Sequence, residues 1–96
     1  MSTTKKQSGG VSAADVEIIR RQAVKIVLGM APEQVEMPTG MTRLVEDLGY
    51  DSLRLFEMAI ALEEHFGVHA PSDEPIQAET LDDVEKLVVR LARVRT

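Results

Sequence analysis

The sequence contains no cysteine and no tryptophan, and aromatic residues make up only 3% of it. Without cysteine the chain forms no disulfide, offers no thiolate nucleophile and builds no cysteine-based zinc site. It also lacks a run near the roughly 20 apolar residues of a membrane-spanning helix, and its N-terminus has no apolar signal-peptide core. These absences favour a single small domain in a reducing cytoplasm, without membrane contact, whose core is built from aliphatic side chains and methionine.

Positive charge is nearly missing from the middle of the chain. Residues 44–85 carry twelve acids and one base, Arg54, whereas residues 1–43 carry six bases and four acids and residues 86–96 carry four bases and no acid. Nucleic acid is disfavoured as a partner of the acidic segment, because phosphate backbones require a cationic surface. Basic proteins are the natural partners of such a patch, although acidic stretches also simply keep small proteins soluble.

Two helices are predicted near the ends of the chain. Apolar residues recur at helical spacing over about residues 13–28, directly after Ser12 and Asp15, which resemble a capping box. Thr80 and Asp83 form a second capping-box pattern, which opens an amphipathic segment with basic residues toward its C-terminal end, where they suit the helix dipole. Both segments therefore have a helical period and a start signal.

A third helix is predicted over about residues 52–65, with Asp51 placed to cap it and Gly67 beyond its end. One broad sector of this helix should face the core, and it holds Leu55, Met58, Ala59, Leu62 and Phe66. The opposite arc mixes branched apolar residues with carboxylates, and it holds Leu53, Glu57, Ile60 and Glu64. Two apolar residues on a solvent-facing arc favour a docking strip for a partner.

The remaining segments lack a sustained period. Residues 30–50 contain two prolines and two glycines and are expected to form a long loop anchored in the core by Leu44 and Leu48. Methionines should fill gaps over the core around this loop, namely Met30, Met37 and Met41.

The predicted fold is an all-α four-helix bundle with three main helices and one short one. Ser72 could cap the short turn, which holds Ile76. We expect residues 1–10 to be a disordered tail and residues 11–94 to form the domain.

Ser52 stands at the start of the acidic helix, where it could serve only as a capping residue. It is a poor nucleophile by itself, because the neighbouring Asp51 disfavours an alkoxide and His65 lies at the far end of a helix roughly 20 Å long. Asp51 is at least as good a cap, which would leave the Ser52 hydroxyl free. The unpaired N–H groups and positive dipole end of a first helical turn suit a phosphodiester. Ser52 is thus better placed to be modified by another enzyme than to catalyse.

The stretch DLGYDSLRLFEMAIALEEHFGV, residues 47–68, resembles the acyl carrier protein family, and the similarity extends over roughly residues 12–93. In that family Asp-Ser-Leu at a helix start marks the attachment serine, so the resemblance assigns Ser52 as the attachment site, flanked by Asp51 and Leu53. It implies a 4′-phosphopantetheine cofactor, transferred from coenzyme A by a phosphopantetheinyl transferase, whose thiol carries acyl groups as thioesters. The protein would then be a carrier and not an enzyme, with no catalytic residue of its own.

The resemblance also implies that the second helix recognises the basic docking surfaces of partner enzymes. Those partners would be the transferase, an acyl- or aminoacyl-loading ligase or transferase, a ketosynthase and other pathway enzymes. Carried over by position, partner recognition falls on Leu53, Glu57, Ile60 and Glu63, with Glu64 adjacent and Arg54 as a departure.

The departures from the family pattern bear on the pathway. Arg54 stands where carriers of fatty acid synthesis usually have an acid, and Tyr50 stands where a small residue often precedes the motif. These differences favour a discrete, monomeric carrier of bacterial polyketide or hybrid natural-product biosynthesis. A peptidyl or aminoacyl carrier of a nonribosomal peptide pathway, a fatty-acid carrier and a non-covalent helical adaptor remain alternatives. His65 and His69 are expected to be solvated side chains and not metal ligands.

Overall fold

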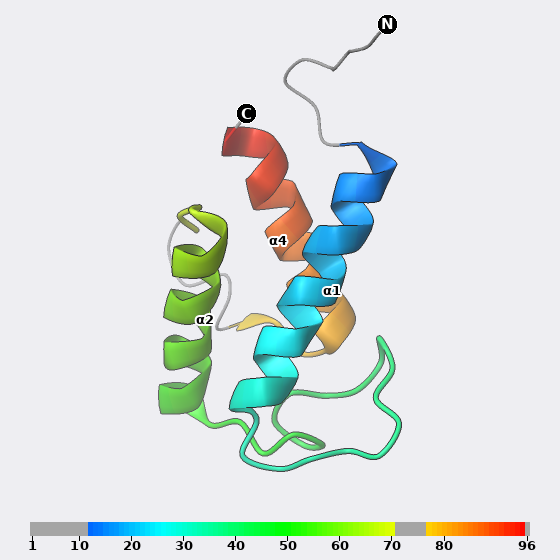
Figure 1. Cartoon of the computed structure of the whole chain (residues 1–96). Coiled ribbons are helices and arrows are strands. Elements are labelled where there is room, and N and C mark those ends of the chain that lie inside the picture. The colour runs from blue at the N-terminus through cyan, green and yellow to red at the C-terminus, as the bar shows by residue number, and fades with distance from the viewer. Residues whose placement is uncertain (1–11, 71–76, 96) are drawn as a thin grey trace, which may run out of the picture.

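The computed structural model describes residues 12–70 and 77–95, which contain three long helices (Figure 1). They are α1 (Ala13–Met30), α2 (Ser52–Phe66) and α4 (Leu81–Arg95). In Figure 1, α1 runs antiparallel to both α2 and α4, so that the end of α1 and the start of α2 lie at the same end of the molecule. The predicted all-α bundle is confirmed.

Three predictions lie outside the described residues or stay untested. The short turn expected around Ser72 and Ile76 and the expected tail at residues 1–10 lie outside the described residues. The domain bounds of residues 11–94 stay a prediction.

Helix α1 begins where the capping pattern places it. Ser12 is its N-cap, and the Ser12 hydroxyl accepts a hydrogen bond from the amide of Asp15 at 3.1 Å. The helix runs two residues beyond the predicted end, to Met30. It stops at Ala31, whose ψ of 132° is extended, because the ring of the following Pro32 disfavours the helical conformation in the residue before it.

Helix α4 begins with a reciprocal capping box. The Thr80 hydroxyl accepts from the Asp83 amide at 3.2 Å, and an Asp83 carboxylate oxygen accepts from the Thr80 amide at 3.1 Å. The same oxygen accepts from the Glu79 amide, and this hydrogen bond is the main reason that the pKa of Asp83 lies below its ordinary value. The prediction of a capping box at this position is confirmed.

The long loop at residues 31–50 is held to the start of α4 by backbone hydrogen bonds. The amide of Leu81 donates to the Thr42 carbonyl at 3.0 Å, and the amide of Asp82 donates to the Gly40 carbonyl at 2.9 Å. The first N–H groups of a helix have no partner within the helix, so the loop satisfies two of them. An isolated antiparallel bridge joins the same two segments. The loop is therefore ordered by pairing with residues about 40 positions further along the chain.

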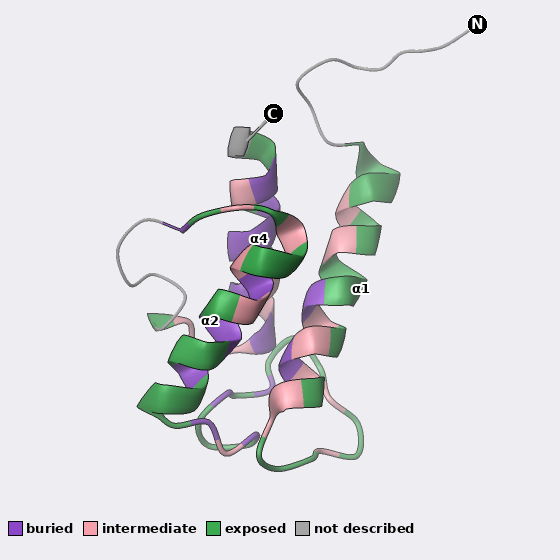
Figure 2. Cartoon of the chain, turned by 60° about the vertical axis from the view of Figure 1, so that its left-hand side comes forward, coloured by how far each residue is buried: buried purple, intermediate pink, exposed green. Residues whose placement is uncertain are grey.

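The core lies where the three helices and this loop meet (Figure 2). The predicted core face of α2 is confirmed, with Phe66 half-buried at its end. Leu44 and Leu48 are fully buried loop anchors, as predicted. The buried cluster consists of Ala23, Val27, Leu44, Leu48, Tyr50, Leu55, Met58, Leu62, Leu81, Val84 and Val88.

The prediction that the methionines fill gaps over the core is wrong for two of the three. Met37 is 83% exposed and Met41 is 77% exposed, whereas Met30 packs partly buried against the core. The two leucine anchors and the backbone hydrogen bonds already fix the loop, so the tips that carry Met37 and Met41 face solvent.

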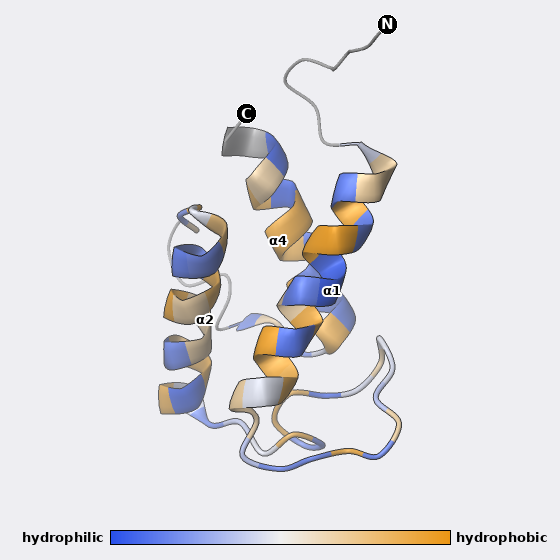
Figure 3. Cartoon of the chain, in the orientation of Figure 1, coloured by the Kyte–Doolittle hydropathy of each residue, from blue (hydrophilic) through white to orange (hydrophobic). Residues whose placement is uncertain are grey.

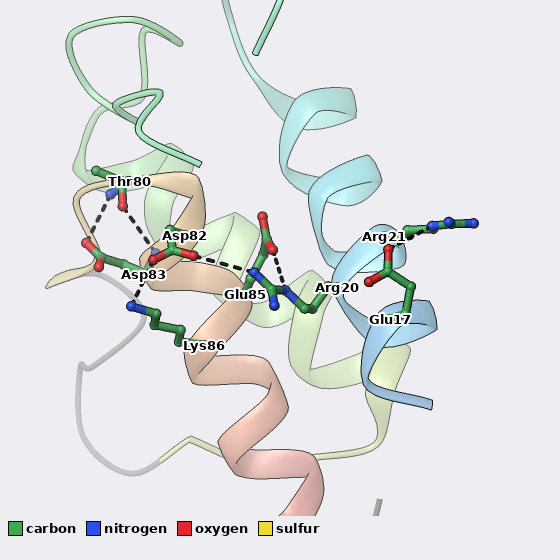
Figure 4. Close-up of polar contacts among 8 residues, drawn as sticks. All are labelled: Glu17, Arg20, Arg21, Thr80, Asp82, Asp83, Glu85 and Lys86. Carbon is green, nitrogen blue, oxygen red and sulfur yellow. Dashed lines mark hydrogen bonds and ion pairs between the residues drawn. The ribbon is translucent and has the colours of Figure 1, made fainter. Parts of the chain in front are cut away.

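Exposed ion pairs join α1 to α4 (Figure 4). The Arg20 guanidinium lies 2.8 Å from Glu85 and 3.6 Å from Asp82, and Asp82 also pairs with Lys86 at 2.9 Å. Such solvated pairs contribute little stability individually, but together they tie the two helices across their outer edge. Over residues 12–70 and 77–95, no helix has the length and apolar character needed to cross a bilayer.

Candidate functional site

The start of α2 leaves the Ser52 hydroxyl free. Asp51 is the N-cap in extended conformation, and its carboxylate accepts from the Arg54 amide at 2.8 Å. The Asp51 carbonyl accepts the first helical hydrogen bond, from Leu55, also at 2.8 Å. Ser52 is the first residue of the helix and is exposed, and within the described residues its hydroxyl makes no hydrogen bond. The capping role therefore belongs to Asp51, and Ser52 is available for modification.

The surroundings of Ser52 suit an attached anion better than autonomous catalysis. Within the described part of the chain, the amides of Ser52 and Leu53 have no acceptor, and they lie at the positive end of the α2 dipole. No histidine is described at this end of the helix, since His65 lies on the last turn of α2 with its Nε2 3.1 Å from the Gln22 side chain. A phosphodiester on the Ser52 oxygen would thus meet donors, whereas a hydroxyl acting alone would lack a base.

The turn before the motif requires glycine at position 49. Gly49 has φ of +77°, a conformation that side chains other than glycine rarely adopt. A Cβ there would also lie 3.0 Å from the side chain of the exposed Glu33. Gly49 thereby lets the loop turn into Tyr50 and the start of α2.

The outward arc of α2 is exposed as predicted (Figure 3 shows hydrophilic and hydrophobic bands alternating along this helix). Leu53 is 67% exposed, and Ile60 and Glu64 are also exposed. The Arg54 guanidinium lies 3.1 Å from the Glu57 carboxylate, so the departure from the family pattern is paired with one of the expected recognition acids.

Glu63 does not lie with this exposed set. Its carboxylate is half-buried and accepts from the Ala70 amide at 2.8 Å, with the His69 ring 3.7 Å away. The Glu63 side chain points toward the residues that follow α2. The spacing of residues along α2 could not predict that Ala70 comes back to meet it.

Phe56 was missed by the sequence reasoning, although it is 52% exposed. It follows Ser52 by four residues and so lies on the same side of the helix. That spacing was the available signal. An exposed aromatic side chain one turn from Ser52 adds to the apolar surface that Leu53 and Ile60 present. Among the residues that the structure describes, no cluster of histidines and carboxylates could hold a metal ion.

Comparison with known proteins identifies the class of protein to which this chain belongs. Residues 21–88 match the family model described as the phosphopantetheine attachment site. The acyl carrier protein of Campylobacter hominis is 35% identical over 71 residues, which cover 74% of this chain and 86% of that protein. That of Campylobacter curvus is 36% identical over 73 residues, covering 76% and 91%.

A solved structure agrees with these relatives. The acetyl actinorhodin acyl carrier protein from Streptomyces coelicolor superposes with a TM-score of 0.58 at 26% identity, over 93% of this chain and all of that one. The chain belongs to the acyl carrier protein family. It is a carrier of acyl groups on a covalently attached 4′-phosphopantetheine and not a catalyst, and it is a substrate for a phosphopantetheinyl transferase and pathway enzymes.

We predict that Asp51→Ala lowers the free energy of unfolding by about 1 kcal/mol, because the Arg54 amide loses its acceptor. Asp51→Asn keeps a side-chain oxygen at the same place and should retain most of that stability. Urea unfolding followed by circular dichroism measures both variants. Equal stability of Asp51→Ala and the wild type would show that the cap contributes nothing.

Proposed function

We propose that Ser52 is the attachment serine and that the protein carries acyl intermediates in bacterial polyketide or hybrid natural-product biosynthesis. The observation that carries the site is the exposed Ser52 hydroxyl, free of hydrogen bonds within the described residues, at a helix start where Asp51 performs the capping. The pathway is supported by Arg54 on the recognition helix and by the similarity to a carrier whose name refers to actinorhodin.

The chemistry at Ser52 is a phosphoryl transfer performed by the transferase. The Ser52 oxygen forms a bond to the phosphorus that bears the pantetheine, the diphosphate bond of coenzyme A breaks, and its adenosine bisphosphate half leaves. The serine proton passes to a base on the transferase, since the neighbouring Asp51 carboxylate is engaged with the Arg54 amide and His65 lies at the far end of α2. When bound, the arm supplies the thiol that this cysteine-free chain lacks.

The chain's own residues present and retain the arm. The amides of Ser52 and Leu53, which have no acceptor within the described residues, would be available to donate to the new phosphodiester. The exposed apolar residues Leu53, Phe56 and Ile60 offer contact area beside it, while Glu57 and Glu64 complement basic surfaces on partner enzymes.

Incubation with coenzyme A and a broad-specificity phosphopantetheinyl transferase tests the proposal. Intact mass should rise by one phosphopantetheine, and peptide mapping should place it on Ser52. Attachment at another residue would refute the site, while a wild type that stays unmodified beside a loaded control carrier would refute the function. The aminoacyl and fatty-acid alternatives are distinguished by the cargo found on protein from the native host. The non-covalent adaptor is no longer supported, because the family carries a covalent arm.

Arg54 should select partners through charge. In Arg54→Glu the ion pair with Glu57 is lost and the strip gains two units of negative charge. We expect the rate of acyl loading by fatty-acid enzymes to rise about fivefold, and the rate with cognate pathway enzymes to fall by a similar factor, since one rim charge contributes on the order of 1 kcal/mol.

Arg43→Glu is the matched control for Arg54→Glu. Arg43 is paired with Glu46 at 3.2 Å with the same sequence spacing, but on the loop and not on α2. Kinetics of thioester formation measure both variants. Equal responses of the two variants would show that only net charge matters, and unchanged rates in Arg54→Glu would refute a role in partner choice.

A further inference from the structure

Tyr50, two residues before Ser52, is the largest fully buried side chain of the described structure and is only 2% exposed. Its hydroxyl donates a hydrogen bond of 2.6 Å to the carbonyl oxygen of Val27 on α1. Most residues that connect two elements of a small bundle lie on its surface. This one instead passes its side chain through the core to a helix 23 positions earlier in the sequence.

The acceptor lies in the part of α1 where helical hydrogen bonds run out. Regular geometry would pair the Val27 carbonyl with the Ala31 amide, but that amide donates to the Leu28 carbonyl at 3.4 Å instead. The last carbonyls of a helix need partners from outside its ladder. The Tyr50 hydroxyl is such a partner, and it ties the C-terminal turn of α1 to the segment that precedes α2.

The backbone of Tyr50 is fixed as well. Its amide donates to the carbonyl of the fully buried Leu44 at 3.0 Å. The next residue, Asp51, is the N-cap of α2, and Ser52 begins the helix. The start of α2 is thus connected through one residue both to the anchored loop and to α1.

Few other polar ties hold α2 in place. In the described parts of the chain, the ion pairs between helices run from α1 to α4, and the Arg54–Glu57 pair lies within α2. Helix α1 also packs more extensively against α4 than against α2. Among the described residues, the hydrogen bond between side chains of α1 and α2 joins Gln22 to His65, which lies at the opposite end of α2 from Ser52. Within the described residues, the Tyr50 hydroxyl therefore provides the buried hydrogen bond between α1 and the segment that leads into Ser52.

We propose that Tyr50 is a positioning residue, which holds the α2 start against α1 through the Val27 carbonyl and so presents Ser52 to the phosphopantetheinyl transferase. This inference rests on the proposed attachment at Ser52. Without this hydrogen bond, the start of α2 would sample orientations that the transferase cannot use. The apparent affinity of the transferase for the protein would then fall in proportion to the fraction of molecules that keep the usable orientation.

The hydroxyl stays a donor over the pH range in which such an enzyme works. Burial raises the pKa of Tyr50 to about 12, against a smaller opposing effect of the Arg54 charge. The hydrogen bond is thus present at neutral pH, and it does not depend on a titration.

Tyr50→Phe tests the inference, because it removes the hydroxyl and keeps the ring. We expect the KM of the transferase for the unmodified protein to rise about fivefold with kcat changed less than twofold. Amide hydrogen exchange should become faster by a similar factor at Arg54 and Leu55, whose N–H groups are bonded to Asp51 at the start of α2. Steady-state kinetics and exchange followed by mass spectrometry measure these effects in the full chain.

Val88→Ala is the control, since it removes buried volume from α4, away from this tie. It should lower the melting temperature at least as much as Tyr50→Phe does while leaving KM and the exchange at Arg54 and Leu55 unchanged. A Tyr50→Phe protein with the wild-type KM and exchange, destabilised only as Val88→Ala is, would overturn the positioning role. Failure of the wild type to be loaded at all would instead refute the proposed function, and this inference with it.

Discussion

Replacing Ser52 by alanine is expected to abolish phosphopantetheine attachment while leaving the stability of the fold within about 0.5 kcal/mol of the wild type. The attachment needs the hydroxyl oxygen as the atom that bonds to phosphorus, and no neighbouring side chain occupies the same place. Stability should not change, because the Ser52 hydroxyl is exposed and makes no hydrogen bond within the described residues, and Asp51 caps the helix. Intact mass after incubation with the transferase, together with urea unfolding, measures both effects.

Ser12 provides a matched control, since it also stands at the start of a helix. Its hydroxyl accepts the Asp15 amide and so caps α1. Ser12→Ala should therefore lose about 1 kcal/mol of stability and remain fully loaded, which is the opposite behaviour to Ser52→Ala. A Ser52→Ala protein that still acquires the arm, or one that is as destabilised as Ser12→Ala, would contradict the division between a capping serine and an attachment serine.

Leu44→Ala is expected to cause the largest loss of stability, about 2–5 kcal/mol, which is a large part of what a domain of this size possesses. Leu44 is fully buried, and it joins several parts of the fold. Its amide donates to the Glu79 carbonyl and its carbonyl accepts from Tyr50. The substitution leaves a cavity beneath the loop that orders both the start of α4 and the approach to Ser52.

Met41→Ala is the control for Leu44→Ala, because Met41 lies three residues earlier on the same loop and is largely exposed. It should change the free energy of unfolding by no more than about 0.5 kcal/mol. Thermal unfolding should show a fall of at least about 8 °C for Leu44→Ala, since each kcal/mol shifts the midpoint of a domain this small by about 4–8 °C. Similar midpoints for the two variants would show that the loop is not anchored through Leu44.

The features that sequence reasoning predicted correctly depend on residues close together in the chain. The N-caps Ser12, Asp51 and Thr80 each bond to an amide three residues later, so their pattern is visible in a short window. The buried and exposed faces of α2 follow from the helical period alone, because side chains three and four positions apart share a face. The end of α2 at Gly67, with φ of 65°, follows from the same local logic.

The features that were missed depend on where distant segments meet. The methionines of the loop were expected to cover the core, but the loop is fixed by hydrogen bonds to the start of α4, and Met37 and Met41 face solvent. The role of Glu63 in partner recognition stays a prediction, but the bond that its carboxylate accepts from the Ala70 amide was not expected. Tyr50 was noted only as a departure from the family pattern, since its bond to Val27 is invisible until the two segments are placed together.

The sequence alone determined the helical period, the caps and the serine that begins the acidic helix, because each of these is a local relation between residues a few positions apart. Only the tertiary structure decided how the long loop is fixed to the start of α4, and how the start of α2 is held against α1. Those relations depend on contacts over tens of residues, such as the 23 positions between Val27 and Tyr50, and such contacts form only when the core brings the segments together.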